Sequence, residues 1–275
     1  MRTINALRAE GRRQLKDGCH IDVDVLLMHI LQIDKNTMLT NPERLVDEDD
    51  ATEFSRLIAL RYKNTPTQYL TGKCEFMSLI FMVDKSVLIP RPDTEILVET
   101  VLANETSGVG LEIGVGSGCV SISLEYYAKG IIMHGVDISR VAVRVAGQNH
   151  QRLLNCKSRF FVSDLFENVP LGTLYDFVVS NPPYIETQEI GNLAENVKGF
   201  EPKIALDGGT NGLKFYRRIC EKVGDYLTAG GRIYFEIGHN QSVDVKHILC
   251  RAGFSDVHIV KDLAGRDRVM WGKKV

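Results

Sequence analysis

Asn181, Pro182, Pro183 and Tyr184 form a tetrapeptide whose residue types could hold a planar amide. The prolines lack backbone N–H groups and have a fixed φ, so the stretch presents carbonyl acceptors on a stiff backbone. An amide NH₂ has two donors, which the Asn181 side-chain oxygen and the Pro182 carbonyl could accept, while the Tyr184 ring could stack on the amide. The tetrapeptide predicts a site that orients a nitrogen for reaction. A proline turn with a core tyrosine is the competing interpretation.

A glycine-rich turn is the second candidate site, and it follows an apolar run that ends in Glu112 and Ile113. Asp137 comes at the end of the next apolar run, where a Rossmann-type acid binds ribose hydroxyls. The G-x-G-x-G spacing differs from the G-x-G-x-x-G of nicotinamide cofactors, and the Glu112 carboxylate would repel pyrophosphate but attract a cationic amino group. These features favour S-adenosylmethionine, unless the glycines serve only strand-helix packing. The turn consists of Gly114, Val115, Gly116, Ser117 and Gly118.

Asp164 and Leu165 follow a third apolar run and are predicted to lie along the same sheet edge. The Asp164 carboxylate could accept a hydrogen bond from the exocyclic adenine amine, and Leu165 could supply an apolar contact. A loop cap is nearly as good an interpretation of Asp164.

Short apolar runs alternate with amphipathic segments from about residue 108, which predicts a mostly parallel α/β sheet. The fourth run leads into Asn181. If it lies beside the first, the tetrapeptide and the glycine turn border one crevice. The predicted strands cover residues 109–113, 131–136, 159–162, 177–180, 232–237, 257–260 and 268–271.

The first part of the chain has helical periodicity, with a third helix expected after the acidic run 47–50. Short β-like runs then precede Pro90 and Pro92, which interrupt regular pairing. Asp93 or Thr94 could cap the helix that begins the second domain. We therefore expect a helical domain over 1–72, a hairpin linker over 73–90 and an α/β domain over 91–275.

Composition limits the classes of function. A net charge of −2 and a pI near 6.4 argue against extensive phosphate binding, so no direct nucleic-acid partner is expected. The six cysteines form no C-x-x-C pair and the seven histidines show no metal-ligand spacing, so no metal is predicted. No run approaches transmembrane length and the N-terminus lacks a secretion signal, so a cytoplasmic protein without membrane contact is expected.

The sequence resembles the PrmC/HemK family of peptide-chain release factor glutamine methyltransferases along almost its whole length. Besides the two candidate sites, the shared motifs include Gln68 to Gly72, the run from Ile89 to Glu95, Glu201-Pro202, Gly208-Gly209 and Gly212-Leu213. Two positions differ from the family pattern. Glu112 replaces a common Asp, and Leu165 stands where members often carry Trp beside the adenine.

The resemblance implies a helical substrate-docking domain, a hairpin linker and a seven-stranded class I, Rossmann-like methyltransferase domain. It also implies that the glycine turn and Asp137 bind S-adenosylmethionine, with S-adenosylhomocysteine as product. Asn181 to Tyr184 would hold the glutamine of a release factor Gly-Gly-Gln loop, which becomes N5-methylglutamine. We expect a monomer.

Two other functions remain open on the residues alone. One is an adenine-N6 DNA methyltransferase, in which the exocyclic adenine amine would offer the same two hydrogen-bond donors to Asn181. Such an enzyme would also need basic groove-reading elements. A non-catalytic nucleotide-binding scaffold would explain the glycine turn and Asp137 but not a donor-receiving Asn181.

Overall fold

The computed structural model describes residues 1–15 and 19–275, which form two compact units. We call them the helical unit, Met1–Lys73 with Ala194–Phe200, and the sheet unit, Cys74–Leu193 with Glu201–Val275. The sequence analysis places residues 194–200 in the α/β domain over 91–275, whereas the structure groups them with the helical unit. Nothing in the sequence indicates this.

The helical unit is built from amphipathic helices around a small apolar core that includes Leu7, Leu26 and Phe54. The helix expected at the acidic run is present as α4, but it is the fourth helix, because α3 was not predicted, and it begins within the run. It follows its N-cap residue Asp47 and carries three acidic residues in its first turn. Negative charge there suits the positive end of the helix dipole. The elements are β1 (Arg2–Thr3), α1 (Ile4–Gln14), α2 (His20–Leu31), α3 (Lys35–Thr40), β2 (Leu45–Val46), α4 (Glu48–Tyr62), α5 (Thr67–Thr71) and α9 (Glu195–Lys198).

The sheet unit contains a seven-stranded sheet with the order β10-β11-β9-β8-β5-β6-β7. The five strands from β9 to β7 run parallel, whereas β11 is antiparallel to both β9 and β10. All seven predicted strands are present. They are β5 (Ser107–Ile113), β6 (Gly130–Asp137), β7 (Arg159–Val162), β8 (Tyr175–Ser180), β9 (Leu227–Glu236), β10 (Phe254–Lys261) and β11 (Asp267–Lys274).

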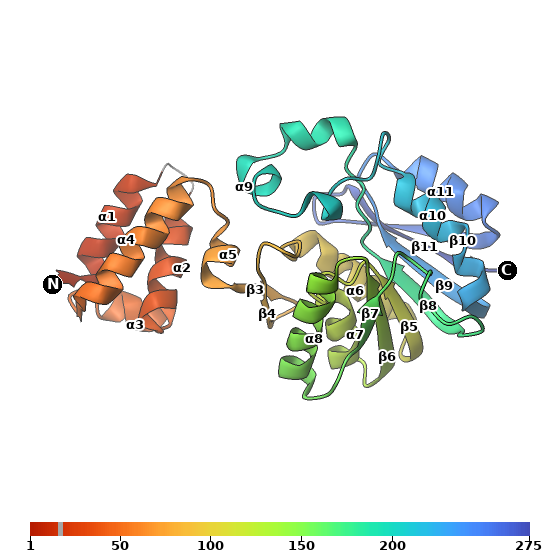
Figure 1. Ribbon diagram of the computed structural model, residues 1–275, viewed down its shortest axis with the longest axis horizontal. Helices are drawn as coiled ribbons and strands as arrows, with labels where there is room; N and C mark the ends of the chain where they lie inside the picture. The colour runs from red at the N-terminus through yellow and green to blue at the C-terminus, as the bar shows by residue number, and fades with distance from the viewer. Residues whose placement is uncertain (16–18) are drawn as a thin grey trace. The chain divides into compact units, whose positions relative to one another are not determined.

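Helices cover both faces of this sheet (Figure 1). Along β8 the buried side chains alternate between two cores, with Phe177 and Val179 facing α6 and α7, and Val178 facing α10. The helices are α6 (Pro92–Asn104), α7 (Cys119–Tyr127), α8 (Arg140–Leu154), α10 (Lys214–Cys220) and α11 (Ser242–Arg251). Short 3₁₀ turns cover Thr187–Asn192, Lys203–Ala205 and Val223–Tyr226.

A hairpin of β3 (Lys73–Phe76) and β4 (Leu79–Met82) precedes α6. The predicted cap of α6 is wrong: Arg91 is the N-cap residue and Pro92 takes the first helical position. Proline suits that position because its missing N–H would have no partner there. The Thr94 side chain is therefore free for another contact.

The strand order decides where the two candidate sites lie. β5 pairs with β8 in parallel, as the sequence analysis expected of the first and fourth strands. The turns after Ile113 and Ser180 consequently leave the same edge of the sheet, side by side. Ligands of open α/β sheets bind at such edges.

Candidate active site

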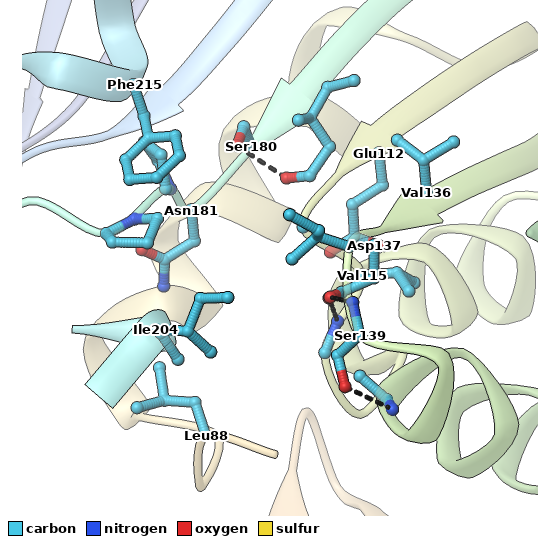
Figure 2. Close-up of a pocket in the computed structure, with 18 of the residues that line it drawn as sticks. Leu88, Glu112, Val115, Val136, Asp137, Ser139, Ser180, Asn181, Ile204 and Phe215 are labelled. Atoms are coloured by element: carbon cyan, nitrogen blue, oxygen red, sulfur yellow. Dashed lines mark hydrogen bonds between the residues drawn. The ribbon is translucent and has the colours of Figure 1, made fainter. Parts of the chain in front are cut away.

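One cavity of about 330 Å³ lies at this edge and is lined only by residues of the sheet unit. Pockets for small molecules start at about this size. Figure 2 shows Glu112, Val115 and Asp137 on one side of the pocket, with Asn181 and Phe215 across from them. The structure therefore brings the two motifs together around one space.

The backbone of the glycine turn is open to this space. Gly114 and Gly116 have φ of +82° and +53°, and a Cβ at either position would meet no atom within 4 Å. A ligand can therefore approach the peptide groups closely. Gly118 differs, because its Cβ would come within 2.7 Å of Ile122 Cδ1 and it does not line the cavity. Its cofactor contact stays a prediction, while its packing role is visible.

Asp137 ties the glycine turn to the next strand. Its Oδ2 accepts a hydrogen bond from the Gly116 N–H at 3.0 Å, and its Oδ1 accepts one from the Ser139 N–H at 2.8 Å. Burial raises the pKa of Asp137, and the two backbone hydrogen bonds oppose that shift. Each carboxylate oxygen can accept a further donor, so the residue can organise the turn and still receive a hydroxyl group.

Glu112 supplies a second acid at the cavity wall and is only 2% exposed. Its Oε2 accepts hydrogen bonds from both the backbone N–H, at 3.0 Å, and the hydroxyl of Ser121 in the first turn of α7. Burial raises the pKa of Glu112 to about 8, although the Ser121 hydrogen bonds lower it. A cationic group in the cavity would favour the ionised form.

Asp164 and Leu165 line the cavity as expected, but Asp164 has a partner that the sequence did not reveal. Its Oδ2 accepts a hydrogen bond from Arg218 Nη2 at 3.0 Å. Leu165 has a φ of +51°, an unusual backbone conformation for a leucine. Arg218 orients the Asp164 carboxylate at the cavity wall.

The Asn-Pro-Pro segment enters the cavity directly after β8. Asn181, Pro182 and Pro183 all line it. The Asn181 Nδ2 donates a hydrogen bond to Thr94 Oγ1 at 3.2 Å, which leaves Oδ1 of the side chain as the acceptor available to a ligand. The amide cradle of Asn181 Oδ1 and the Pro182 carbonyl stays a prediction.

Tyr184 is held behind the cavity and does not line it. Its hydroxyl donates to Glu236 Oε1 at 3.2 Å, and its carbonyl accepts from Gln241 Nε2 at 3.0 Å. Burial raises the pKa of Tyr184, and the nearby Glu236 adds to the effect. The backbone is also closely packed, because a Cβ on Gly212 would come within 2.3 Å of the Tyr184 carbonyl oxygen. Stacking of the ring on a substrate stays a prediction.

The comparisons with known proteins agree with this geometry. The family model of the methyltransferase small domain matches residues 91–197, and that of the PrmC N-terminal domain matches residues 6–72. A release factor glutamine methyltransferase from Clostridium acetobutylicum is 43% identical over 90% of this chain and 89% of its own length. One from Clostridium botulinum is 40% identical over 98% of this chain and 99% of its own. The chain belongs to the release factor glutamine methyltransferase family.

Membership of this methyltransferase family confirms the resemblance and the predicted class of enzyme, an S-adenosylmethionine-dependent methyltransferase. A crystal structure of a methyltransferase from Pyrococcus furiosus has a TM-score of 0.56 and 19% identity, and the match covers 72% of this chain and 90% of that one. At that identity the likeness shows the fold alone. It confirms the Rossmann-like α/β class predicted from the strand pattern.

Several cavity residues of this family member were not predicted from the sequence to line the site. Leu88 and Ile204 form an apolar part of the wall below Asn181 (Figure 2), and Thr94 comes from the first turn of α6. Phe215 and Arg218 come from α10, where a three-residue spacing puts both near one helix face. That spacing was the only sequence signal for this wall.

No cluster of three or more His, Cys, Asp or Glu side chains that could hold a metal ion occurs in residues 1–15 and 19–275. In the same part of the chain, no helix is both long and apolar enough to cross a membrane.

Proposed function

We propose that this chain transfers a methyl group from S-adenosylmethionine to the side-chain amide nitrogen of the glutamine in the Gly-Gly-Gln loop of peptide-chain release factors. The bond from sulfur to the methyl carbon breaks, a bond from that carbon to nitrogen forms, and the amide nitrogen loses one proton. The products are S-adenosylhomocysteine and N5-methylglutamine. The names of the similar proteins support the substrate class.

The observation that carries the proposal is that Asn181 and the glycine turn line the same cavity. A ligand bound to the turn and an amide held by Asn181 would therefore share one cavity of about 330 Å³. A planar amide nitrogen is a poor nucleophile because its lone pair is delocalised. Fixed alignment is consequently the main contribution that this wall can make to the rate.

The residues on one side of the cavity fit the cofactor. We assign the ribose to Asp137, whose oxygens can accept further hydrogen bonds, and the cationic amino group to buried Glu112. Asp164 and Leu165 would border the adenine. The open backbone at Gly114 and Gly116 would lie along the ligand. Val115, Ser117 and Gly118 complete the segment that we assign to the cofactor. When bound, the sulfonium supplies the electrophilic methyl group.

The residues on the other side would hold the glutamine. Asn181 Oδ1 and the Pro182 carbonyl would accept the two amide N–H groups, while Pro183 stiffens the segment. Asn181 would then border both ligands. Tyr184 would support this wall from behind, through the hydrogen bonds that fix its hydroxyl and its carbonyl. These groups leave the nitrogen lone pair directed at the methyl carbon.

The helical unit is proposed to dock the release factor, because the two candidate motifs and the cavity all belong to the sheet unit. This gives residues 1–72 a docking role, 73–90 a linking role and 91–275 the chemistry. We further propose that the enzyme acts as a monomer in the cytoplasm, where translation termination takes place, and binds no nucleic acid directly.

Transfer of labelled methyl groups tests the function. The enzyme is incubated with methyl-labelled S-adenosylmethionine and one of three acceptors: a bacterial release factor, the same factor with the loop glutamine replaced by alanine, or adenine-containing DNA. We expect label only on the unaltered factor. Label on both factors would contradict the glutamine assignment, and label on DNA alone would support an adenine methyltransferase instead.

A further inference from the structure

Asn149 lies within α8, is 0% exposed and does not line the cavity. Burying a side-chain amide is costly unless its donors and its acceptor all have partners. Each polar atom of this amide has a partner, and the partners belong to two segments that are distant from Asn149 in the chain. One segment is the hairpin and the other is the glycine turn.

On the hairpin side, Asn149 pairs with the backbone of β4. Its Oδ1 accepts a hydrogen bond from the Met82 N–H at 2.8 Å, and its Nδ2 donates to the Met82 carbonyl at 2.9 Å. The amide thus bonds to both backbone groups of one strand residue, as the backbone of an adjacent antiparallel strand does. Arg152, three residues further along α8, donates to the Ile80 carbonyl. Because Ile80 and Met82 are two positions apart on β4, α8 follows this strand.

The opposite end of the hairpin is held by two other helices. Glu95 Oε1 of α6 accepts from the Met77 N–H at 2.6 Å, and the Tyr127 hydroxyl of α7 donates to the Met77 carbonyl at 2.6 Å. Of the four side chains that bond to the hairpin backbone from α6, α7 and α8, Asn149 is the one that also bonds to the glycine turn.

On the turn side, Asn149 fixes one peptide group. Its Nδ2 donates to the Ser117 carbonyl at 2.9 Å, and Ser117 lines the cavity. The N–H of the same peptide group, that of Gly118, donates to the Val115 carbonyl at 2.7 Å. Because a peptide group is planar, these two hydrogen bonds hold it from both sides. Asn149 therefore sets the orientation of backbone at the cavity wall from behind that wall.

We propose that Asn149 is a positioning residue for cofactor binding and that it couples the glycine turn to the hairpin. A ligand that orders the turn then also stabilises the Met82 end of the hairpin, and by reciprocity a loosened hairpin weakens the ligand. β3 begins at Lys73, where the first segment of the helical unit ends, so the coupled strands are the part of the chain that leads from that unit. That the ligand is S-adenosylmethionine rests on the proposed function.

Calorimetry with S-adenosylhomocysteine tests the positioning role. Asn149→Ala removes all three hydrogen bonds, and we expect Kd to rise at least about 5-fold. Arg152→Ala is the matched control, because it removes a contact between α8 and the same strand but leaves the contacts of Asn149 in place. It should change Kd less than about 2-fold. A folded Asn149→Ala protein with an unchanged Kd, or equal losses of affinity in the two variants, would overturn the proposal.

Hydrogen exchange measured by mass spectrometry tests the coupling in the unaltered enzyme, so the result does not depend on the folding of a variant. Saturating S-adenosylhomocysteine should slow exchange in residues 73–82 at least about 3-fold more than in β10. β10 is an edge strand without a cavity residue, and it reports the general stabilisation that any bound ligand gives. Asn149→Ala should abolish the extra protection, whereas Arg152→Ala should retain it. Equal slowing of the two segments in the unaltered enzyme would refute the coupling.

These readouts separate the coupling from the proposed function. An enzyme that shows the expected dependence on Asn149 but methylates no release factor would refute the substrate assignment and leave the coupling standing. An enzyme that methylates the release factor glutamine, while residues 73–82 gain no extra protection from S-adenosylhomocysteine, would do the reverse.

Discussion

Replacing Asp137 by alanine tests the assignment of the cofactor side of the cavity. The variant loses the hydrogen bonds that Gly116 N–H and Ser139 N–H donate to the carboxylate at 3.0 Å and 2.8 Å. Hydrogen bonds to a charged group contribute about 1.5–3 kcal/mol each. Gly116 and Ser139 both line the cavity, so we use the lower end and expect the free energy of unfolding to fall by about 3 kcal/mol.

Cofactor binding should weaken by a separate amount. If Asp137 also accepts from the ribose, each lost charge-assisted bond costs about 1.5–3 kcal/mol, which raises Kd by roughly 10- to 150-fold. Asp137→Asn should also bind weakly, because its NH₂ group must oppose one of the two backbone N–H donors.

Calorimetry with S-adenosylmethionine, together with melting curves with and without ligand, separates the two effects. Asp207→Asn is the matched control, since this acid holds the Gly209 N–H at 3.0 Å but does not line the cavity. It should leave Kd unchanged. A folded Asp137→Ala protein with the same Kd as the unaltered enzyme, or with equal affinity for NAD, would refute the cofactor assignment.

Three further predictions concern the acid, the tyrosine and the helical unit. Burial raises the pKa of Glu112 to about 8, so its contribution to stability is present below about pH 4.5 and is lost as pH rises to 8. Melting experiments at pH 5 and pH 9 give the free energy of unfolding of Glu112→Gln minus that of the unaltered protein. This difference should be up to a few kcal/mol more positive at pH 9 than at pH 5. A difference that does not change with pH would count against a buried carboxyl. Tyr184→Ala should lower the methylation rate more than Tyr184→Phe does, and equal rates would remove the role of the ring. In Tyr184→Phe the free energy of unfolding should also fall by about 1–3 kcal/mol, because Glu236 loses a hydrogen-bond donor. Ile21 and Tyr62 are both exposed, and each is the chain neighbour of one member of the Arg61–Asp22 ion pair. Changing both to serine should raise KM for intact release factor without altering cofactor Kd. An unchanged KM would exclude this end of the unit from docking.

The sheet and its two motifs were predictable because their signals are local. Alternating apolar runs, glycines at a tight turn and prolines after a strand each reflect the conformation of the chain within a few residues. Parallel pairing of the first and fourth strands then followed from the usual topology of such sheets. Together with that topology, these three signals predict from the sequence alone that Asn181 lies beside the glycine turn.

The partners of the site residues were not predictable, because they lie far apart in the chain. Arg218 contacts Asp164 although the two residues are 54 positions apart in the chain, and nothing in the local spacing marks the pair. Thr94 shows the same limit. Its position before an apolar helix suggested a cap, but Pro92 begins the helix and the hydroxyl contacts Asn181 instead. Only tertiary packing reveals which of these two roles a threonine has.

The central claim is that the methyl group goes to the glutamine nitrogen held by Asn181. Tandem mass spectrometry of a release factor, incubated with enzyme and methyl-labelled S-adenosylmethionine, locates the label on a single residue. The account predicts one methyl group on the side chain of the Gly-Gly-Gln glutamine, formed by the unaltered enzyme and reduced about 100-fold or more in rate by Asn181→Ala. Label on any other residue, or an undiminished rate with Asn181→Ala, would contradict it.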